Sequence, residues 1–258
     1  MLEVKNVGKV YGDSRRAYIA LESVDLTIKE GEFLCLLGSS GCGKSTLLNI
    51  LAGFERSSSG RVLLNGRDIN GPGQDRVMFF QDAGSALFPW LNCLENVEFG
   101  LRIRRVPKDR RTDIATRYLA TVGLAEHLEK FPAELSGGMR QRLQIARALA
   151  IEPKIFLMDE PFAALDALTR RNMHRVLAEI WTATRKTIVF VTHDIAEAIT
   201  MADRIVIMTP GPGSRLRDPI EIELPRPRSP SDPGFGKLFN QIESIISAEH
   251  SYANGVAA

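Results

Sequence analysis

A stretch of nine residues rich in glycine and serine has the residue types and spacing of a phosphate-binding loop. It reads Gly38-Ser39-Ser40-Gly41-Cys42-Gly43-Lys44-Ser45-Thr46, and it stands between an apolar run, residues 33–37, and a helix-like run, residues 47–52. Glycines let the backbone curl so that successive N–H groups point at phosphate oxygens, and the start of the following helix adds unpaired N–H groups. Lys44 can reach the β- and γ-phosphates, and the Ser45 hydroxyl can ligate Mg²⁺. The stretch predicts that the chain binds a nucleoside triphosphate.

Two carboxylates follow a second apolar run. Residues 155–158 are apolar without interruption, which is typical of a buried parallel strand, and Asp159 and Glu160 come directly after them. Doubly wound sheets bind their ligands at the carboxyl ends of such strands. Asp159 is then placed to hold Mg²⁺, usually through water, and Glu160 to orient or deprotonate the attacking water. Alone, the pair would be read as the cap of a helix, but the phosphate-binding loop upstream favours catalysis.

Two further polar residues stand at the ends of apolar runs. His193 follows the run at 187–191, so it is expected at the same sheet edge as Glu160, where it can sense the γ-phosphate. Gln81 follows the run at 77–80, and its amide oxygen can ligate Mg²⁺ or orient water. A single histidine is more often structural, and a single glutamine is usually just solvated.

A second glycine-containing motif reads Leu135-Ser136-Gly137-Gly138-Met139-Arg140-Gln141-Arg142. Ser136 is a typical N-cap, and the two glycines leave the first N–H groups of a helix open to an anion. An ordinary capped helix is the alternative interpretation. One nucleotide cannot readily be held by both loops of one chain if they lie on separate lobes, but the two loops can meet across a dimer.

Exposed aromatic residues add two weaker signals. Tyr11, in a loop upstream of the phosphate-binding loop, can stack on adenine or serve only in packing. The apolar segment Phe88-Pro89-Trp90-Leu91 is expected in a loop, where a small satellite core and a docking patch for a partner are equally supported.

Composition narrows the classes of function. The 258 residues include 33 Lys and Arg against 31 Asp and Glu, and this near balance argues against a nucleic-acid binder. No apolar run approaches the roughly 20 residues of a membrane span, and the N-terminus does not resemble a signal peptide. The three cysteines have no metal-like spacing and are expected to be reduced thiols in a cytosolic protein.

The order of elements predicts an α/β fold. Alternating strands are expected at 2–7 and 21–28, mainly helices over 92–150, and a helix from about 167 to 182. Residues 224–230, rich in proline, predict a stiff extended linker, and a short helix is expected from about 235 to 246, before a polar tail. The predicted catalytic core comprises residues 1–83 and 151–230, with 84–150 as an inserted helical subdomain and 231–258 as a C-terminal helix and tail.

Taken together, these residues resemble the ATP-binding subunit of an ABC transporter over about residues 2–246. The phosphate-binding loop, Gln81, the signature at Leu135 to Gln141, the pair Asp159-Glu160 and His193 occur in the order of that family. The resemblance implies a P-loop NTPase core with an N-terminal antiparallel β region and an inserted helical subdomain. It implies that Asp166 lies in a dimer-contact loop, that Tyr11 stacks on adenine, and that Ser136, Gly137, Gly138 and Gln141 act on the nucleotide of the other subunit.

Finer features are similar to the nitrate, sulfonate and taurine import group. They are Gly71-Pro72-Gly73-Gln74-Asp75-Arg76, Phe88-Pro89-Trp90-Leu91 followed by Glu95-Asn96-Val97, and Leu224-Pro225-Arg226-Pro227. Two departures stand out. The gap between Gln81 and Pro89 is about two residues longer than usual, which puts the substrate subgroup in doubt, and Ala163 stands where a glycine is common.

The resemblance also implies partners and a location. ATP and Mg²⁺ are the expected cofactors, and two copies are expected to meet head to tail as a homodimer. A separate integral membrane permease, docked through Phe88 to Leu91, and an extracytoplasmic solute-binding protein complete the system, with no nucleic acid. The chain is then expected at the cytoplasmic face of the inner membrane. Alternatives are an exporter or lipid-transport ATPase, a soluble ABC ATPase without a transport role, and a small-molecule kinase.

Overall fold

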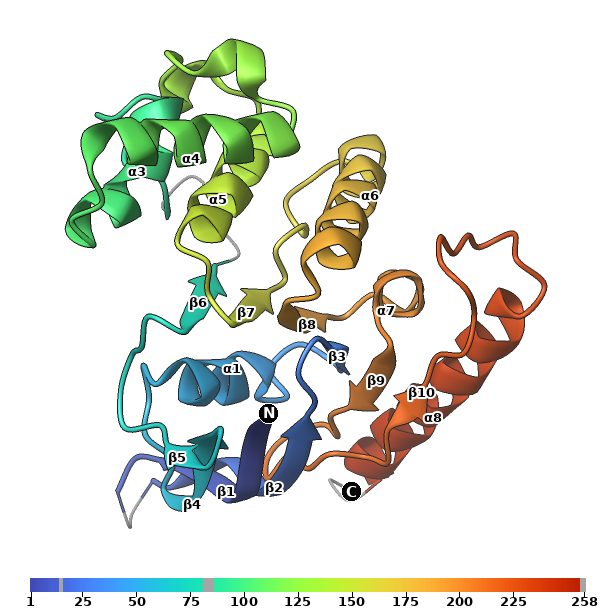
Figure 1. The fold of residues 1–258 in the computed structure, drawn as a ribbon. Helices are drawn as coiled ribbons and strands as arrows, with labels where there is room; N and C mark the ends of the chain where they lie inside the picture. Colours follow the sequence, from blue (N-terminus) through green and yellow to red (C-terminus); the bar gives the residue numbers. More distant parts are fainter. Residues whose placement is uncertain (14–15, 81–85, 256–258) are drawn as a thin grey trace.

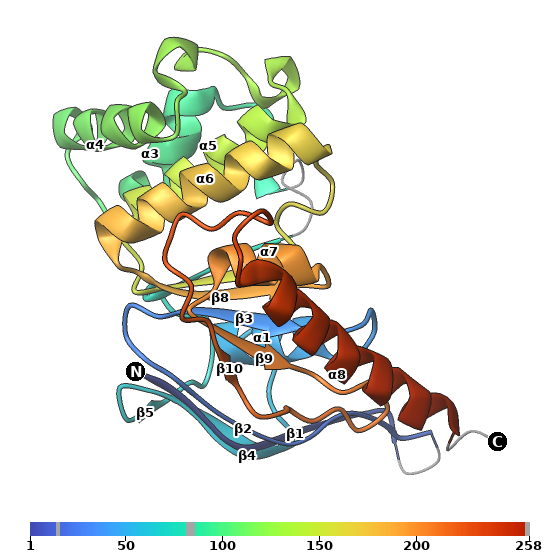
Figure 2. The same ribbon diagram turned by 90° about the vertical axis from the view of Figure 1, so that its right-hand side faces the viewer.

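The fold consists of two β-sheets with one helix between them. The other helices lie on the opposite face of the second sheet, at one end of the molecule and beside the last strands (Figures 1 and 2). The computed structural model describes residues 1–13, 16–80 and 86–255. Within these ranges an antiparallel sheet has the strand order β2-β1-β4-β5, with bounds β1 Leu2–Tyr11, β2 Tyr18–Ile28, β4 Ser59–Leu64 and β5 Arg67–Asp68. Asn65 and Gly66, both with positive φ, form the turn between β4 and β5.

The second sheet is parallel apart from its edge strand β10. In the described residues its order is β10-β9-β3-β8-β7-β6, with bounds β3 Phe33–Leu37, β6 Arg76–Phe79, β7 Ile155–Asp159, β8 Thr187–Thr192, β9 Arg204–Ile207 and β10 Ile220–Glu221. β3 is therefore a central strand, although it comes first in sequence. Strands β3, β7 and β8 are almost entirely buried, which explains their unbroken apolar runs, whereas β6 is only partly buried.

Each parallel strand divides its side chains between two hydrophobic cores. In β3, Leu34 and Leu36 face helix α1 (Lys44–Ala52) and the antiparallel sheet, whereas Phe33, Cys35 and Leu37 face the opposite way. This alternation follows from the period of two in a strand. The views agree that α1 lies between the sheets and that α6 (Ala167–Thr184) and α7 (Ile195–Met201) cover the other face (Figures 1 and 2).

The helices α3, α4 and α5 pack on one another at one end of the molecule (Figure 1). Their bounds are α3 Cys93–Ile103, α4 Lys108–Thr121 and α5 Gly137–Ala150. Ser136 caps α5, and Asn92 and Glu95 form a capping box at the start of α3. The predicted fold class is thus confirmed, while the exact division into subdomains stays a prediction. None of the helices in the described ranges is long and apolar enough to cross a membrane.

The C-terminal region was predicted to contain a stiff extended linker, and in the structure that segment is bonded to the core. Arg228 is buried and donates from Nε to the carbonyl oxygen of Leu224 at 2.7 Å and from Nη2 to that of Ile222 at 3.0 Å, and its Nη1 donates to the carbonyls of Ile199 and Ala202. The final helix α8, Phe235–Gly255, continues well beyond residue 246 and packs on α7. The prolines predicted an extended segment, but the arginines between them fix it to the core.

We expect replacement of Arg228 by methionine to lower the free energy of unfolding by about 2–4 kcal/mol, because several buried carbonyls lose their donor. Arg228 is only 8% exposed, so water has little access to the carbonyls that lose their donor, and the same burial lowers the pKa of Arg228 to about 10. Urea denaturation measures the change. Arg215→Met is the matched control: its exposed pair with Glu22 should contribute less than about 0.5 kcal/mol. Equal effects of the two substitutions would contradict the anchoring role.

Candidate active site

The carboxyl ends of three neighbouring parallel strands bring the predicted catalytic residues to one edge of the sheet. β3 leads into the phosphate-binding loop, β7 ends at Asp159, and His193 follows the last residue of β8. The register pairs Leu37 with Thr192 and Asp159 with Val191, so the three strand ends are level. The sheet therefore places the loop, the two carboxylates and the histidine side by side.

Glycine is required at two points of the loop. Gly43 has φ +94° immediately before α1, and a Cβ there would lie 2.9 Å from Leu21 Cδ2 and 3.1 Å from the carbonyl oxygen of Ala20. Gly41 has φ +79° with open space around it, so its backbone conformation alone demands glycine. Both constraints leave the N–H groups of residues 39–45 on a tight curve at the start of a helix, which is suited to a phosphate.

Lys44 is held inside the loop. Its Nζ donates to the carbonyl oxygens of Gly38 and Ser39, each at 2.8 Å, and the residue is only 5% exposed. The thiol of Cys42 is buried beside it, and burial raises the pKa of this thiol. Cys42 can therefore serve a phosphate only through its backbone N–H, whereas Lys44 brings a positive charge to the centre of the loop.

Asp159 and Ser45 supply two oxygen atoms at the same point. Their side chains form a hydrogen bond, and burial raises the pKa of Asp159. Carboxylate and hydroxyl oxygens are the ligands that Mg²⁺ prefers, and Mg²⁺ in nucleotide sites takes few protein ligands because phosphate and water complete its shell. These residues fit a Mg²⁺ ion bound together with a nucleotide.

We expect Asp159→Asn to abolish Mg²⁺-dependent turnover while raising the melting temperature of the nucleotide-free protein by on the order of 2 °C. The raised pKa of Asp159 means that its charged form is less favourable in the folded than in the unfolded state, so it destabilises the fold at neutral pH. This penalty is relieved as the pH falls through the raised pKa. The melting temperatures of parent and variant should therefore approach one another as the pH is lowered from 7.5. A variant less stable than the parent at pH 7.5 would contradict the argument.

Glu160 and His193 form a pair across the strand ends. His193 Nδ1 lies 3.0 Å from Glu160 Oε2, and the histidine side chain is 56% exposed whereas that of Glu160 is 19% exposed. Glu160 has φ +43°, a strained conformation for a residue other than glycine, and its N–H donates to the carbonyl oxygen of Val191 at 3.1 Å. The strand thus turns sharply at Glu160 and aims the carboxylate at the imidazole.

Tyr11 lies at the end of β1 and not in a loop, because β1 and β2 pair as far as Tyr11 and Tyr18. Its hydroxyl donates to Glu55 Oε2 at 2.7 Å and lies 3.4 Å from Thr46 Oγ1 in the first turn of α1. Lys9 Nζ lies 4.8 Å from the centroid of the ring. The contact with Thr46 places the ring next to the phosphate-binding loop, and its role toward adenine stays a prediction.

The second glycine motif packs on the segment that follows Glu160. Ser136 Oγ accepts a hydrogen bond from the N–H of Met139 at 3.3 Å. A Cβ on Gly138 would lie 2.5 Å from Thr169 Cγ2, so glycine is needed for α5 to approach α6 this closely. Gln141 is buried, and Nε2 of its amide lacks a hydrogen-bond partner in the described structure. A groove of about 540 Å³ opens here, lined by Ser136, Gly138, Arg142, Leu168, Thr169, Arg171, Asn172, Met173 and Arg175.

Asp166 caps helix α6. Its Oδ1 accepts from the N–H groups of Leu168 at 3.1 Å and Thr169 at 3.0 Å, and these bonds lower the pKa of Asp166. The family resemblance implies that Asp166 lies in a dimer-contact loop, and this role stays a prediction for the exposed capping residue.

The segment Phe88 to Leu91 contains one packed and one exposed aromatic side chain, and its docking role stays a prediction. The Phe88 ring packs on Phe99 at 4.2 Å between centroids, whereas Trp90 is 69% exposed. The fully buried side chain of Asn96 holds the segment, because it bonds to the N–H and carbonyl of Phe88 and to the carbonyl of Leu91. A fixed loop thus presents an aromatic side chain outward. Gln81, the other residue assigned to this region, lies outside the described residues.

Three residues near the site carry contacts that the sequence did not indicate. Arg170 donates to the carbonyls of the loop after Glu160, and His174 and Glu197 form a pair next to Thr192. The spacing of Asp194 and Glu197 is the only signal in the sequence, and it predicts a capping box. In the structure, Asp194 caps α7, but the carboxylate of Glu197 turns to His174 and Thr192 instead.

Comparison with known proteins identifies the family of the chain. The ABC transporter family model matches residues 21–163. The nitrate import ATP-binding protein NrtD of Synechocystis sp. is 41% identical over 253 residues, which cover 95% of this chain and 94% of that protein. The bicarbonate transport ATP-binding protein CmpD of the same organism is 44% identical over 246 residues, 93% of this chain and 86% of that protein.

A solved structure is similar over most of the fold. It is the dimeric post-hydrolysis state of the ATP-binding cassette MJ0796 bound to ADP and Pi, with a TM-score of 0.75 and 34% identity over 87% of this chain and 100% of that one. Family model, relatives and solved structure thus agree on the family of the chain. The chain belongs to the ABC transporter family, as an ATP-binding subunit that hydrolyses ATP.

Proposed function

We propose that this subunit powers the import of a small inorganic or organic anion through a separate membrane permease. The observation that carries the ATPase chemistry is the gathering of Lys44, Asp159, Glu160 and His193 at the ends of β3, β7 and β8. The import of an anion is supported by relatives whose names describe nitrate import and bicarbonate transport. Nitrate and bicarbonate are therefore candidate substrates. The resemblance to the nitrate, sulfonate and taurine import group adds alkyl sulfonates and taurine.

Each residue of the site has a role in this proposal. The N–H groups from Gly38 to Thr46 bind the phosphates, and Lys44 neutralises charge on the β- and γ-phosphates. Glu160 orients and deprotonates the attacking water, and His193 contacts the γ-phosphate while it keeps the Glu160 side chain in place. Tyr11 contacts adenine.

Ser45, Asp159 and Gln81 are the proposed residues at the Mg²⁺ ion. When bound, the ion offsets negative charge on the phosphate oxygens. The hydrogen bond between Ser45 and Asp159 supports this assignment, because it holds two oxygen ligands together before any cation arrives. Asp159 is also partly buried, so a cation would compensate for the carboxylate's lost hydration.

Two subunits are proposed to enclose each nucleotide. Ser136, Gly137, Gly138 and Gln141 of one subunit would complete the site of the other, and Asp166 would lie at the contact. The open groove beside Ser136 and Gly138 and the dimeric state of the similar cassette bound to ADP and Pi support this arrangement. Closing a symmetric dimer in this way makes two equivalent sites. Loss of the γ-phosphate contacts would then release the dimer.

The permease is proposed to dock on Phe88, Pro89, Trp90 and Leu91. The exposure of Trp90 on a loop held by Asn96 supports this choice, since aromatic side chains on a fixed scaffold favour interfaces. The subunit would then lie at the cytoplasmic face of the inner membrane. An extracytoplasmic protein would deliver the solute, with no nucleic acid involved.

Uptake measured in the native host tests the proposal. The parent gene is replaced by one that encodes Glu160→Gln, and uptake of isotopically labelled nitrate, bicarbonate, an alkyl sulfonate and taurine is compared. We expect the uptake of one of these anions to be lost and to return when the parent gene is restored. In parallel, tagged Glu160→Gln protein is purified from membranes with ATP, and a multi-pass membrane protein should accompany it.

Two outcomes would overturn the transport function without touching the ATPase. One is unchanged uptake of all four anions in cells whose purified subunit has lost turnover. The other is recovery of ribosomal or DNA-bound partners without a membrane protein. Trp90→Ala is a useful companion variant, because it should keep the ATPase activity of the isolated subunit and weaken recovery of the membrane protein.

A further inference from the structure

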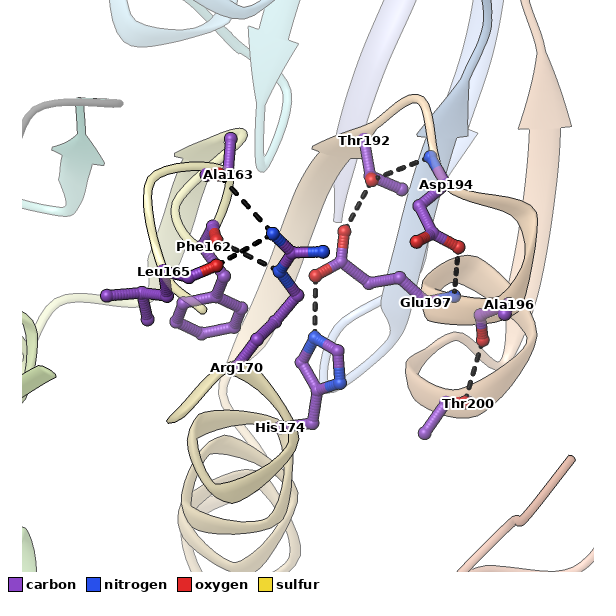
Figure 3. A network of polar contacts seen from close by, with 10 residues as sticks. All are labelled: Phe162, Ala163, Leu165, Arg170, His174, Thr192, Asp194, Ala196, Glu197 and Thr200. Carbon is purple, nitrogen blue, oxygen red and sulfur yellow. Dashed lines mark hydrogen bonds and ion pairs between the residues drawn. The ribbon is translucent and has the colours of Figure 1, made fainter. Parts of the chain in front are cut away.

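A buried polar network joins helix α6 to the segment that carries His193 (Figure 3). His174 Nε2, on α6, lies 2.6 Å from Oε1 of Glu197, on α7. The other carboxylate oxygen of Glu197 accepts a hydrogen bond from the hydroxyl of Thr192, the last residue of β8. Thr192 Oγ1 in turn accepts from the N–H of Asp194 at 3.0 Å. The two residues that flank His193 are thus tied, through Glu197, to α6.

The first turn of the same helix holds the loop that follows Glu160. Arg170 Nε donates to the carbonyl oxygen of Phe162 at 3.2 Å, and its Nη2 donates to those of Leu165 at 2.8 Å and Ala163 at 3.4 Å (Figure 3). The Phe162 ring also packs against the His174 ring, with 5.4 Å between their centroids. Helix α6 therefore bonds to residues 162–165 through Arg170, and it is linked to the end of β8 through His174 and Glu197.

These contacts form a closed ring of interactions that includes the catalytic pair. The loop after Glu160 is bonded to α6, and His174 on α6 is linked through Glu197 to Thr192. Next to Thr192, His193 lies 3.0 Å from Glu160, which completes the ring. Asp166, the cap of α6, stands at the exposed end of the loop. A displacement of that loop would be transmitted to both catalytic side chains, because α6 is a rigid element between them.

The chemistry of Glu197 favours a positioning role over simple stabilisation. A glutamate three residues after an N-cap normally turns back to the N–H of the cap residue, but here that N–H is bonded to Thr192. Glu197 is 8% exposed, and its two carboxylate oxygens bond to His174 on α6 and to Thr192 at the end of β8. Buried ionisable groups contribute little net stability compared with well-packed apolar residues, whereas directional bonds fix geometry.

We propose that His174 and Glu197 are positioning residues that set the distance between His193 and Glu160 and couple it to the loop at the dimer contact. This inference rests on the roles proposed above for Glu160 and His193. Neither His174 nor Glu197 touches the nucleotide in this scheme. His174 acts as a donor to Glu197, and Glu197 orients the backbone on either side of His193 through Thr192.

The test compares two substitutions of His174 in the full chain. His174→Gln can place an amide N–H near the position of Nε2 and keep the bond to Glu197, whereas His174→Leu keeps the packing on Phe162 and removes the donor. We expect His174→Leu to lower kcat by about 10-fold to 100-fold, because small misplacements of catalytic groups are costly. The KM for ATP should stay within about twofold, since the phosphate-binding loop is untouched. His174→Gln should keep most of the parent's kcat.

A His193→Ala background separates positioning from general damage. If His174 acts through His193, His174→Leu should cause little further loss of kcat in that background, because coupled residues are not additive. An equal fold loss in both backgrounds would overturn the proposal, as would a His174→Gln variant as slow as His174→Leu. Glu179→Gln, on the exposed face of α6, is the matched control and should match the parent.

The outcomes also separate this inference from the proposed catalytic roles. If His193→Ala and Glu160→Gln both keep the parent's turnover, the roles of the catalytic pair are wrong, whatever His174 does. If those two variants are slow but His174→Leu is as fast as the parent, only the positioning role fails. Melting temperatures of all variants confirm that each comparison is made between folded proteins.

Discussion

Glu160→Gln should bind ATP as tightly as the parent and lose turnover by about 100-fold to 10,000-fold, the range associated with general acid–base catalysis. Glutamine has the shape of glutamate and can keep a hydrogen bond to His193, but it cannot accept a proton from water. The backbone at Glu160 adopts φ +43° in the parent, and glutamine meets the same strain, so the substitution changes the chemistry and leaves the geometry. Phosphate release measures turnover, and equilibrium binding of a fluorescent ATP analogue measures affinity.

The same variant should accumulate as a dimer when ATP is present. ATP that is bound but not hydrolysed keeps its γ-phosphate contacts, so the closed state is not released. Size-exclusion chromatography with and without ATP measures the shift. Glu223→Gln, an exposed carboxylate away from the sheet edge, is the control and should behave as the parent in both assays. Turnover of Glu160→Gln near that of the parent would remove Glu160 from the role of base.

Lys44→Ala should weaken ATP binding by at least about 100-fold, because a charge-assisted contact to phosphate and the loop's own support are lost together. In the structure the Lys44 ammonium donates to the carbonyl oxygens of Gly38 and Ser39. Without the lysine, these two carbonyl oxygens lose their donor in a largely buried position. The phosphate-binding loop then loses the contacts that keep its N–H groups pointing inward. The effect therefore concerns binding itself, in contrast to Glu160→Gln.

Equilibrium binding of the fluorescent ATP analogue, with thermal melting alongside, checks this prediction. Lys29→Ala removes an exposed lysine elsewhere in the chain and should leave affinity unchanged. Unchanged affinity in Lys44→Ala would show that the loop does not bind phosphate in the way proposed here. A variant that fails to fold would be recognised by its melting curve, and Lys44→Met, which keeps most of the buried side-chain volume, then replaces it.

The placement of the candidate site residues was largely predictable because these residues obey local rules. Glycines with positive φ, a lysine beside them and carboxylates after an apolar strand each have a short-range physical reason, and the common edge follows from parallel strands. The position of β3 between β9 and β8 was not predictable, because apolar runs do not encode which strands become neighbours. Tyr11 was assigned to a loop, although the ladder between β1 and β2 extends to it with several irregularities in register.

The contacts that the sequence did not reveal are long-range. Arg226 and Arg228 lie among prolines that predict an extended linker, yet they also bond to partners 23 to 29 residues away along the chain. His174 and Glu197 stand 23 residues apart on different helices, and the local spacing at Glu197 indicates a capping bond that does not form. The partners of such side chains depend on how the helices pack. They can therefore be identified only after the helices have been placed in the structure.

The alternation of side chains in the central sheet has a consequence for how the protein melts. Strands β3, β7 and β8 belong to both hydrophobic cores at once, so neither core can open without exposing apolar groups of the other. Unfolding should therefore be cooperative across the two sheets, with one calorimetric transition in place of two. The helices α3 and α4 lie at the far end of a single core, and their amides are the ones expected to exchange with solvent first.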